Sequence, residues 1–132
     1  MDKVFDLVKE AGTFFLATSE ANGQPRVRPF GFFMKLDGKL YFGGGKHKPF
    51  FQQITANPKF EICAWAAAKG QWVRIAGTAV LDDSEAVYEA AIADSPNLKG
   101  MYPESKLLGN FYIKDATATI SSFAGDPEVI NF

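Results

Sequence analysis

Apolar and polar residues alternate along most of this chain, which is the pattern expected of β-strands that bury one face. On this basis we predict the following strands: residues 13–19, 25–36, 39–44, 59–67, 71–81 and 111–123. Tight turns at residues 20–24, which contain Asn-Gly, and at Asp37-Gly38 join the first three strands into an antiparallel meander.

Helical spacing of apolar residues is found in other segments. The predicted helices are residues 2–12, 48–57 and 82–96. The first ends at Gly12 and the second ends before Pro58. The third is capped by Asp82 or Asp83 and ends at Ser95-Pro96. Residues 97–110 show no regular pattern, and residues 125–132 are predicted to be a tail. We therefore expect a single domain over residues 1–132, mainly β with flanking helices, and the many short strands favour a sandwich or a barrel.

Composition excludes several classes of protein. Hydrophobic residues make up 47% of the chain and its formal net charge is −1, which argues against disorder and against nucleic acid as the main partner. No apolar run is long enough for a membrane span and no signal-peptide pattern is found, so we expect a cytoplasmic protein without membrane contact. With one cysteine, Cys63, and one histidine, the chain lacks the ligands for a zinc or iron–sulfur site. If it is an enzyme, an organic cofactor carries the reaction.

The segment YFGGGKHKPF, residues 41–50, is the main candidate for chemistry. Gly43 and Gly44 allow the backbone to approach a ligand, and the helix predicted to begin at Pro49 offers unpaired N–H groups and the positive end of its dipole. Side chains that can donate to an anion stand between them: Lys46, His47 and Lys48. The combination favours a phosphate site, although the order differs from a Walker A loop. The alternative is a glycine turn followed by a solvated loop, with a histidine that has no chemical role.

Arg26 and Arg28 strengthen the phosphate interpretation. They lie on the same face of the predicted strand 25–36, which precedes the strand that leads into the glycine corner. One of them could therefore reach the same anion, and the planar guanidinium suits phosphate oxygens. Surface ion pairs are the alternative.

Further residues are compatible with a bound ring-shaped ligand. Pro29 and Gly31 interrupt the predicted strand 25–36, which indicates an edge, a bulge or the close approach of a ligand. Trp65 and Trp72 supply apolar faces on which a flat ring can stack. The alternative for both tryptophans is packing in the core.

The order of these motifs resembles the FMN-binding split barrel of the pyridoxamine 5′-phosphate oxidase-like superfamily. Between Thr13 and Asp83 the chain has an LATxxxNGQPxxRPF opening, a DGKLYF hairpin, a basic corner, an NP helix end and a VRIxGxA strand. The resemblance implies a six-stranded antiparallel split β-barrel that forms a homodimer and holds FMN at the subunit interface.

Carried over position by position, the resemblance assigns most cofactor contacts to two segments. The strand segment that would run beside the flavin ring consists of Arg26, Val27, Arg28, Pro29 and Phe30. Gly43 and Gly44 precede the segment that would bind the FMN phosphate, which consists of Lys46, His47 and Lys48, with Arg26 or Arg28 helping. Trp72 would approach the cofactor from the partner subunit.

Departures from the family pattern narrow the expected activity. Lys46 stands where the family usually has Ser or Thr, so charge replaces a hydroxyl contact. No histidine or arginine follows Arg74, which argues against true pyridoxamine phosphate oxidase activity. The KHK segment is more similar to the small Nim-type members, the nitroimidazole-resistance group.

The expected function is therefore that of an FMN-dependent oxidoreductase with a small-molecule electron donor and acceptor. No catalytic acid or base is assigned, although His47 is of the side-chain type that serves most often in that role near neutral pH. The alternatives are a non-catalytic FMN-binding electron carrier and a related barrel that holds a deazaflavin or a haem.

Overall fold

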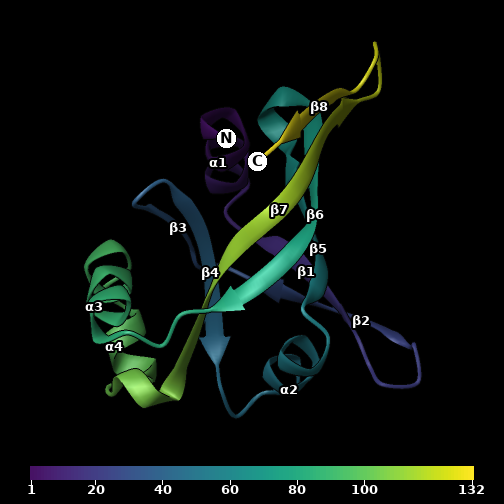
Figure 1. Cartoon of the computed structure of the whole chain (residues 1–132). Coiled ribbons are helices and arrows are strands. Elements are labelled where there is room, and N and C mark those ends of the chain that lie inside the picture. The colour runs from purple at the N-terminus through teal and green to yellow at the C-terminus, as the bar shows by residue number, and fades with distance from the viewer.

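A curled sheet of eight strands organises the chain in the computed structural model, which describes residues 1–132 (Figure 1). The strands are β1 (Phe14–Ser19), β2 (Pro25–Phe30), β3 (Phe33–Leu36), β4 (Lys39–Gly45), β5 (Lys59–Ala66), β6 (Gln71–Leu81), β7 (Leu108–Ser122) and β8 (Glu128–Asn131). All neighbours are antiparallel, in the order β2-β1-β5-β6-β7-β4-β3, and β8 pairs with the second half of β7. The mainly β class is confirmed.

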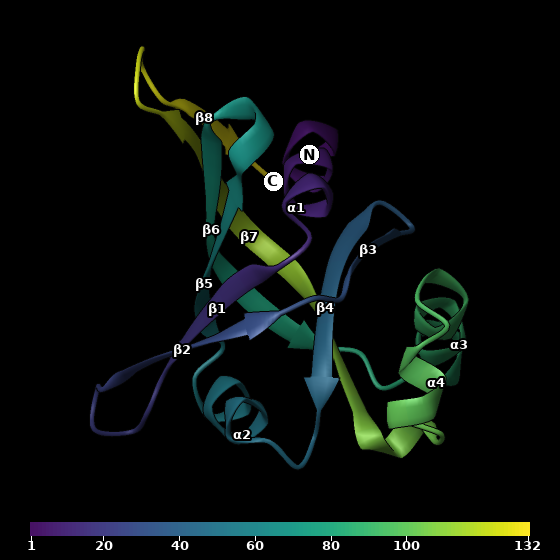
Figure 2. The ribbon, with the colours of Figure 1, turned by 180° about the vertical axis from the view of Figure 1, so that it is seen from behind.

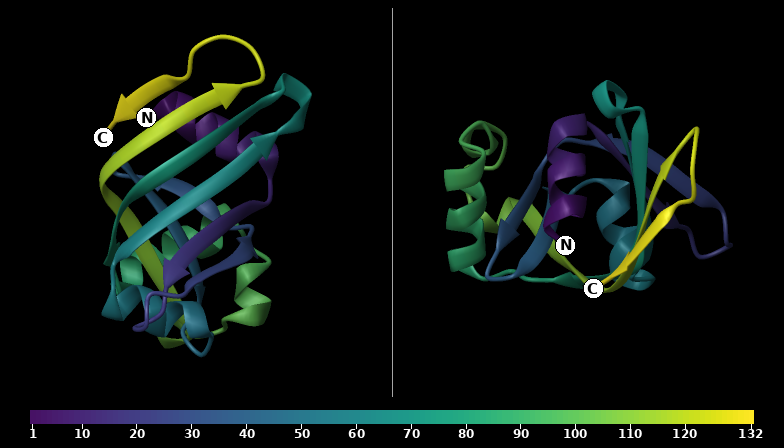
Figure 3. Two further views of the ribbon diagram at one scale, coloured as in Figure 1. Left: turned by 90° about the vertical axis from the view of Figure 1, so that its right-hand side faces the viewer. Right: turned by 90° about the horizontal axis from the view of Figure 1, so that it is seen from above.

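The sheet is rolled because the strands at its two ends follow each other in sequence. β2 and β3 are separated only by Gly31 and Phe32, yet they lie at opposite ends of the strand order. So short a connection cannot cross a flat sheet of this width, and the sheet curls until its end strands approach each other (Figure 3). The result is a barrel that is left open between β2 and β3, in agreement with the expected split-barrel fold.

The strand count is eight instead of six for two reasons. The predicted strand 25–36 is interrupted at Gly31 and forms both β2 and β3. The predicted tail 125–132 contains β8, and just beyond it Ala116 and Phe132 exchange backbone hydrogen bonds of 2.6 and 2.9 Å. Alternating polarity over four residues is too short a signal to separate such an edge strand from a tail.

The predicted meander is correct only in part. β1 and β2 form one hairpin and β3 and β4 form another, but β4 takes β7 as its second neighbour. The arginine-bearing strand β2 is therefore not paired with the strand that carries the glycines. β2 is an edge strand, which explains how it tolerates Pro29, a residue without a backbone N–H.

Two helices cover the ends of the barrel: α1 (Asp2–Ala11) at one end and α2 (Pro49–Ala56) at the other (Figures 1 and 2). The core between them contains 22 buried residues, including Leu7 of α1 and Phe50 and Ile54 of α2. The Phe50 ring meets the Phe30 ring edge-on, with centroids 4.9 Å apart, and so fixes α2 against β2. Each fully buried phenylalanine contributes about 1.5–3 kcal/mol of hydrophobic stabilisation.

Helices α3 (Glu85–Asp94) and α4 (Leu98–Met101) lie outside the barrel, beside β3 and β4 (Figure 1). They bury a second cluster of nine residues, in which Tyr41 of the sheet meets Tyr88 and Tyr102 of the helical segment. The stretch 97–110, for which no pattern was found, thus contains α4 and a short 3₁₀ turn, Ser105–Leu107. None of the helices has the length and apolar character that a membrane crossing requires.

The start of α3 differs from the prediction in its cap. Ser84, not Asp82 or Asp83, caps the helix, because its hydroxyl accepts a hydrogen bond from the Val87 N–H at 3.3 Å. The Asp82 carboxylate instead accepts hydrogen bonds from the Ser84 N–H at 3.1 Å and the Tyr41 hydroxyl at 3.4 Å. Burial acts to raise the pKa of Asp82, but these hydrogen bonds outweigh it and lower that pKa below the usual 3.8. Burial first, and then the charge of Asp82, raise the pKa of Tyr41 to about 12, so its hydroxyl stays protonated as a donor.

Candidate functional site

The glycine corner lies where β4 ends next to α2, and each of its glycines meets a close neighbour. A Cβ on Gly43 would lie 2.6 Å from a side-chain oxygen of β7, and one on Gly44 would lie 2.8 Å from the ring of Phe50. A Cβ on Gly45 would lie 2.6 Å from the ring of His47. Only glycine fits at these positions without movement of its surroundings.

Helix α2 begins as predicted, with Pro49 at its first position and Lys48 as its N-cap. The Lys48 N–H donates to the Gly45 carbonyl oxygen, and the Phe51 N–H donates to the Lys48 carbonyl oxygen, both at 3.1 Å. The N–H groups of His47 and Phe50 have no partner in the protein. Together with the positive end of the helix dipole, they offer two donors to an anion.

Two of the cationic side chains expected at the site are already paired with carboxylates. Lys46 Nζ lies 2.9 Å from Asp83 Oδ1, and Arg26 Nη2 lies 3.2 Å from Glu20 Oε2. Both pairs are partly open to solvent, where such pairs contribute at most about 1 kcal/mol. A phosphate would have to compete with these carboxylates for Lys46 and Arg26.

The other two cations, Lys48 and Arg28, have no carboxylate within 4.0 Å. Arg28 donates only to neutral oxygens: from Nη1 to Thr18 Oγ1 at 2.7 Å and from Nη2 to Gln53 Oε1 at 2.6 Å, with weaker contacts to backbone carbonyls. Burial, and then the positive charge of Arg26, lower the pKa of Arg28. A partly buried positive charge without a counter-ion is stabilised when an anion binds beside it.

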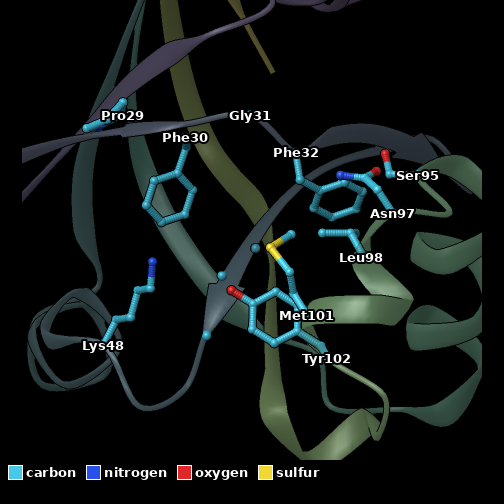
Figure 4. A pocket seen from close by; sticks show the side chains of 13 residues that line it. Pro29, Phe30, Gly31, Phe32, Lys48, Ser95, Asn97, Leu98, Met101 and Tyr102 are labelled. Carbon is cyan, nitrogen blue, oxygen red and sulfur yellow. The ribbon is translucent and has the colours of Figure 1, made fainter.

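A pocket of about 320 Å³ brings several of the predicted residues together (Figure 4). Its walls come from three parts of the chain: the connection from β2 to β3, the glycine end of β4 with the turn that follows, and the segment of α3 and α4. The predicted residues that line it are Pro29, Phe30, Gly43, Gly44 and Lys48. The Lys48 side chain reaches into it toward the ring of Phe30.

The other predicted site residues lie outside this pocket. They are Arg26, Val27, Arg28, Lys46, His47 and Trp72. His47 is exposed, with its ring over Gly45. The turn that precedes Trp72, residues 67–69, lies at the α1 end of the barrel, whereas α2 lies at the opposite end (Figures 1 and 2). Within one chain, Trp72 and the glycine corner are therefore apart.

The helical wall of the pocket is the part that the sequence did not indicate. Leu98, Met101 and Tyr102 stand across the pocket from Phe30 and Lys48 (Figure 4). Their spacing of i, i+3 and i+4 was the only signal, and it extends over a single helical turn. A pattern that short does not identify a helix, still less a site.

The outer face of β2, β1, β5 and β6 carries an uncovered apolar stripe. Val27 is 68% exposed, Phe15 46% and Trp65 45%. Trp65 stands opposite Trp72 in the β5–β6 register, with ring centroids 6.1 Å apart, and Phe123 packs against both indoles. We call these five residues the apolar stripe.

Known proteins share this architecture. The family model described as pyridoxamine 5′-phosphate oxidase matches residues 1–111. A crystal structure of a NimC/NimA family protein from Clostridium acetobutylicum is 39% identical, with a TM-score of 0.93, and the match covers 100% of this chain and 92% of that one. No curated protein matches the chain.

More distant structures share the fold alone. General Stress Protein 26 from Bacillus anthracis is 17% identical, with a TM-score of 0.75 and coverage of 99% of this chain and 97% of that one. A heme-binding protein from Mycobacterium smegmatis is 14% identical, with a TM-score of 0.78 and coverage of 98% of this chain and 56% of that one. The family match over most of the chain and the 39% identity confirm the resemblance drawn from the motifs. The chain belongs to the pyridoxamine 5′-phosphate oxidase family, and it is similar to NimC/NimA-type members.

Proposed function

We propose that the protein is a cytoplasmic FMN-binding oxidoreductase that passes electrons between small molecules. The observation that carries this proposal is Lys48, an ammonium group without a counter-ion that reaches into a pocket beside bare glycine backbone. Membership of the pyridoxamine 5′-phosphate oxidase family supports a flavin as the ligand.

The residues present fit FMN in both charge and shape. For the phosphate, the corner offers the Lys48 ammonium and the free N–H groups of His47 and Phe50, and Arg28 adds an uncompensated charge on β2. For the ring, the pocket offers the Phe30 side chain and a stretch of backbone without side chains at Gly43 and Gly44. The donors for an anion and the apolar wall thus lie beside one another.

When bound, the flavin supplies the electron-transfer chemistry, and the protein supplies position and electrostatics. Lys48 balances the phosphate charge and so fixes the position of the ligand in the pocket. The backbone from Pro29 to Gly31 runs along one wall, where its polar groups can hydrogen-bond to the edge of a ring. Phe30 and Leu98 would exclude water from the two sides of a bound ring.

We further infer that a second copy of the chain completes the site. The apolar stripe places several exposed apolar side chains on one face of the sheet, and grouped exposure of this kind is typical of protein interfaces. Trp72 lies away from the glycine corner in its own chain, so it could contact a cofactor only across such an interface. Size-exclusion chromatography with light scattering tests this inference, and a monomer at micromolar concentration contradicts it.

A haem is the second candidate ligand, because His47 is exposed next to Gly45, which lines the pocket, and a heme-binding protein shares the fold. The visible spectrum of the purified protein, repeated during titration with FMN, separates the two. Flavin bands or saturable FMN uptake support the proposal, and a Soret band favours haem. The absence of both spectra, together with no uptake of FMN, contradicts both candidates.

A non-catalytic electron carrier remains the alternative for a flavin-loaded protein. Steady-state assays with NADH or NADPH and a small acceptor distinguish the two roles. Turnover supports the oxidoreductase, whereas reduction of the flavin only by a partner protein supports the carrier.

A further inference from the structure

The helical wall of the pocket holds Tyr102 in a fixed position. Its N–H donates to the Leu98 carbonyl oxygen at 2.7 Å, and its carbonyl oxygen accepts a hydrogen bond from the Tyr88 hydroxyl at 2.6 Å. Its ring packs over β4 so closely that a Cβ on Gly45 would lie 3.2 Å from a ring carbon. The side chain is therefore in place before any ligand arrives.

The Tyr102 hydroxyl, by contrast, has no partner. The residue is only 8% exposed, yet its hydroxyl makes no hydrogen bond in the protein. Figure 4 shows the hydroxyl pointing into the pocket, toward the glycine end of β4. The hydroxyl is open to the pocket and not enclosed in the core, so a ligand that enters the pocket can take it as a hydrogen-bond partner.

The surroundings of the hydroxyl define the shape of that ligand. Leu98 and Met101 flank Tyr102 with apolar surface, and Phe30 stands on the opposite side (Figure 4). Apolar side chains on two sides, with polar groups on the helical wall at Tyr102, Ser95 and Asn97, suit a flat ring with a polar edge. Lys48 lies on the Phe30 side, so a phosphate held there and a ring edge held at Tyr102 would be recognised at separate points.

We propose that Leu98, Met101 and Tyr102 recognise the flavin ring, with the Tyr102 hydroxyl hydrogen-bonded to its polar edge. This inference rests on the proposed function, since it takes the flavin as the ring in the pocket. Tyr102 is then a residue that determines ring affinity, whereas Lys48 determines the preference for the phosphorylated form.

Lumiflavin, which has the flavin ring but no ribityl phosphate, isolates the ring contact. Tyr102→Phe removes only the hydroxyl, and we expect it to raise the dissociation constants of lumiflavin and FMN by the same factor, about 2- to 12-fold. Tyr112→Phe is the matched control, because Tyr112 lies on β7 outside the pocket, and it should leave both constants unchanged. Thermal unfolding should be the same for Tyr102→Phe as for the parent protein, since the hydroxyl makes no bond within the protein.

A second measurement does not depend on any variant. In protein labelled with ¹³C at the methionine methyl groups, lumiflavin should shift the signal of Met101, which lines the pocket and is 58% exposed. The signal of Met34, buried on β3, should move much less. Aromatic rings displace the resonances of groups that they contact, so the Met101 shift reports where the ring lies.

The outcomes separate the two claims. If FMN binds but Tyr102→Phe leaves lumiflavin affinity unchanged and the Met101 signal does not move, the inference is wrong and the proposed function stands. If neither FMN nor lumiflavin binds to folded protein, the proposed function fails and the inference fails with it. Equal weakening of both ligands, with a Met101 shift, supports both.

Discussion

The two lysines of the glycine corner should contribute unequally to FMN binding. The sequence treats Lys46 and Lys48 as equivalent, because both flank His47. In the structure Lys46 is held by Asp83 at 2.9 Å, whereas Lys48 has no carboxylate nearby and reaches into the pocket. We therefore expect Lys48→Ala to weaken FMN binding far more than Lys46→Ala.

The magnitude follows from the kind of contact each lysine can make. A hydrogen bond to a charged group contributes about 1.5–3 kcal/mol, so Lys48→Ala should raise the FMN dissociation constant about 10- to 150-fold. Lys46 does not line the pocket and Asp83 already balances its charge, so Lys46→Ala should remove at most about 1 kcal/mol of FMN binding, a change in affinity of less than about fivefold. Asp83→Asn frees Lys46 and should tighten FMN binding by a similar small factor.

Titration of flavin fluorescence at fixed ionic strength measures these constants. Riboflavin, which lacks the phosphate, is the control ligand, and its affinity should be the same in the parent protein and in Lys48→Ala. The reasoning is refuted if Lys46→Ala weakens FMN as much as Lys48→Ala does. It is also refuted if Lys48→Ala weakens riboflavin and FMN equally, because the lysine would then act on the ring or on the fold.

Other substitutions test the fold, the interface and the pH dependence. Gly44→Ala places a Cβ 2.8 Å from the ring of Phe50 and should lower the free energy of unfolding by about 1–3 kcal/mol in denaturant titrations, whereas Gly31→Ala, which meets nothing within 4 Å, should be nearly neutral. Val27→Asp, in the apolar stripe, should shift the protein toward monomer in light scattering without lowering its melting temperature by more than a few degrees, and an unchanged dimer would exclude that face. The folded-state pKa of Asp82 is lowered, so its carboxylate stabilises the fold above about pH 4 and this contribution is lost as the pH falls below 3.8. The difference in melting temperature between the parent protein and Asp82→Asn should thus shrink from pH 6 to pH 3, and a constant difference would contradict the hydrogen-bonding argument.

The sequence predicted the long elements well because their periodicity is strong. The strand 71–81 and the helix ending at residue 56 or 57 agree with β6 and α2 to within a residue. The prediction failed where the course of the chain depends on the whole sheet and not on the local sequence. Pro29 and Gly31 interrupt the predicted strand 25–36 in the sequence, but only the closure of the barrel shows that the chain passes there from one edge of the sheet to the other.

The candidate site was predictable in its glycine corner but not in its charge balance. Glycines, lysines and a helix start are local features, and the structure places them together as expected. Which cation is free depends on carboxylates that come from elsewhere in the chain. Asp83 follows Lys46 by 37 positions, and no pattern in the sequence connects them.

The glycines at the end of β4 are required both by core packing and by the pocket. The strand β4 fills both its faces with large side chains at Tyr41 and Phe42, one toward the helices outside and one toward the barrel core. From Gly43 onward it presents no side chains, and the space on its inner face is taken by Phe50, which closes the barrel. On the outer face the same absence lets Tyr102 approach the backbone and leaves the pocket beside it. A glycine run that first suggested only room for a ligand is therefore equally a requirement of core packing, and a substitution there would alter the site and the fold together.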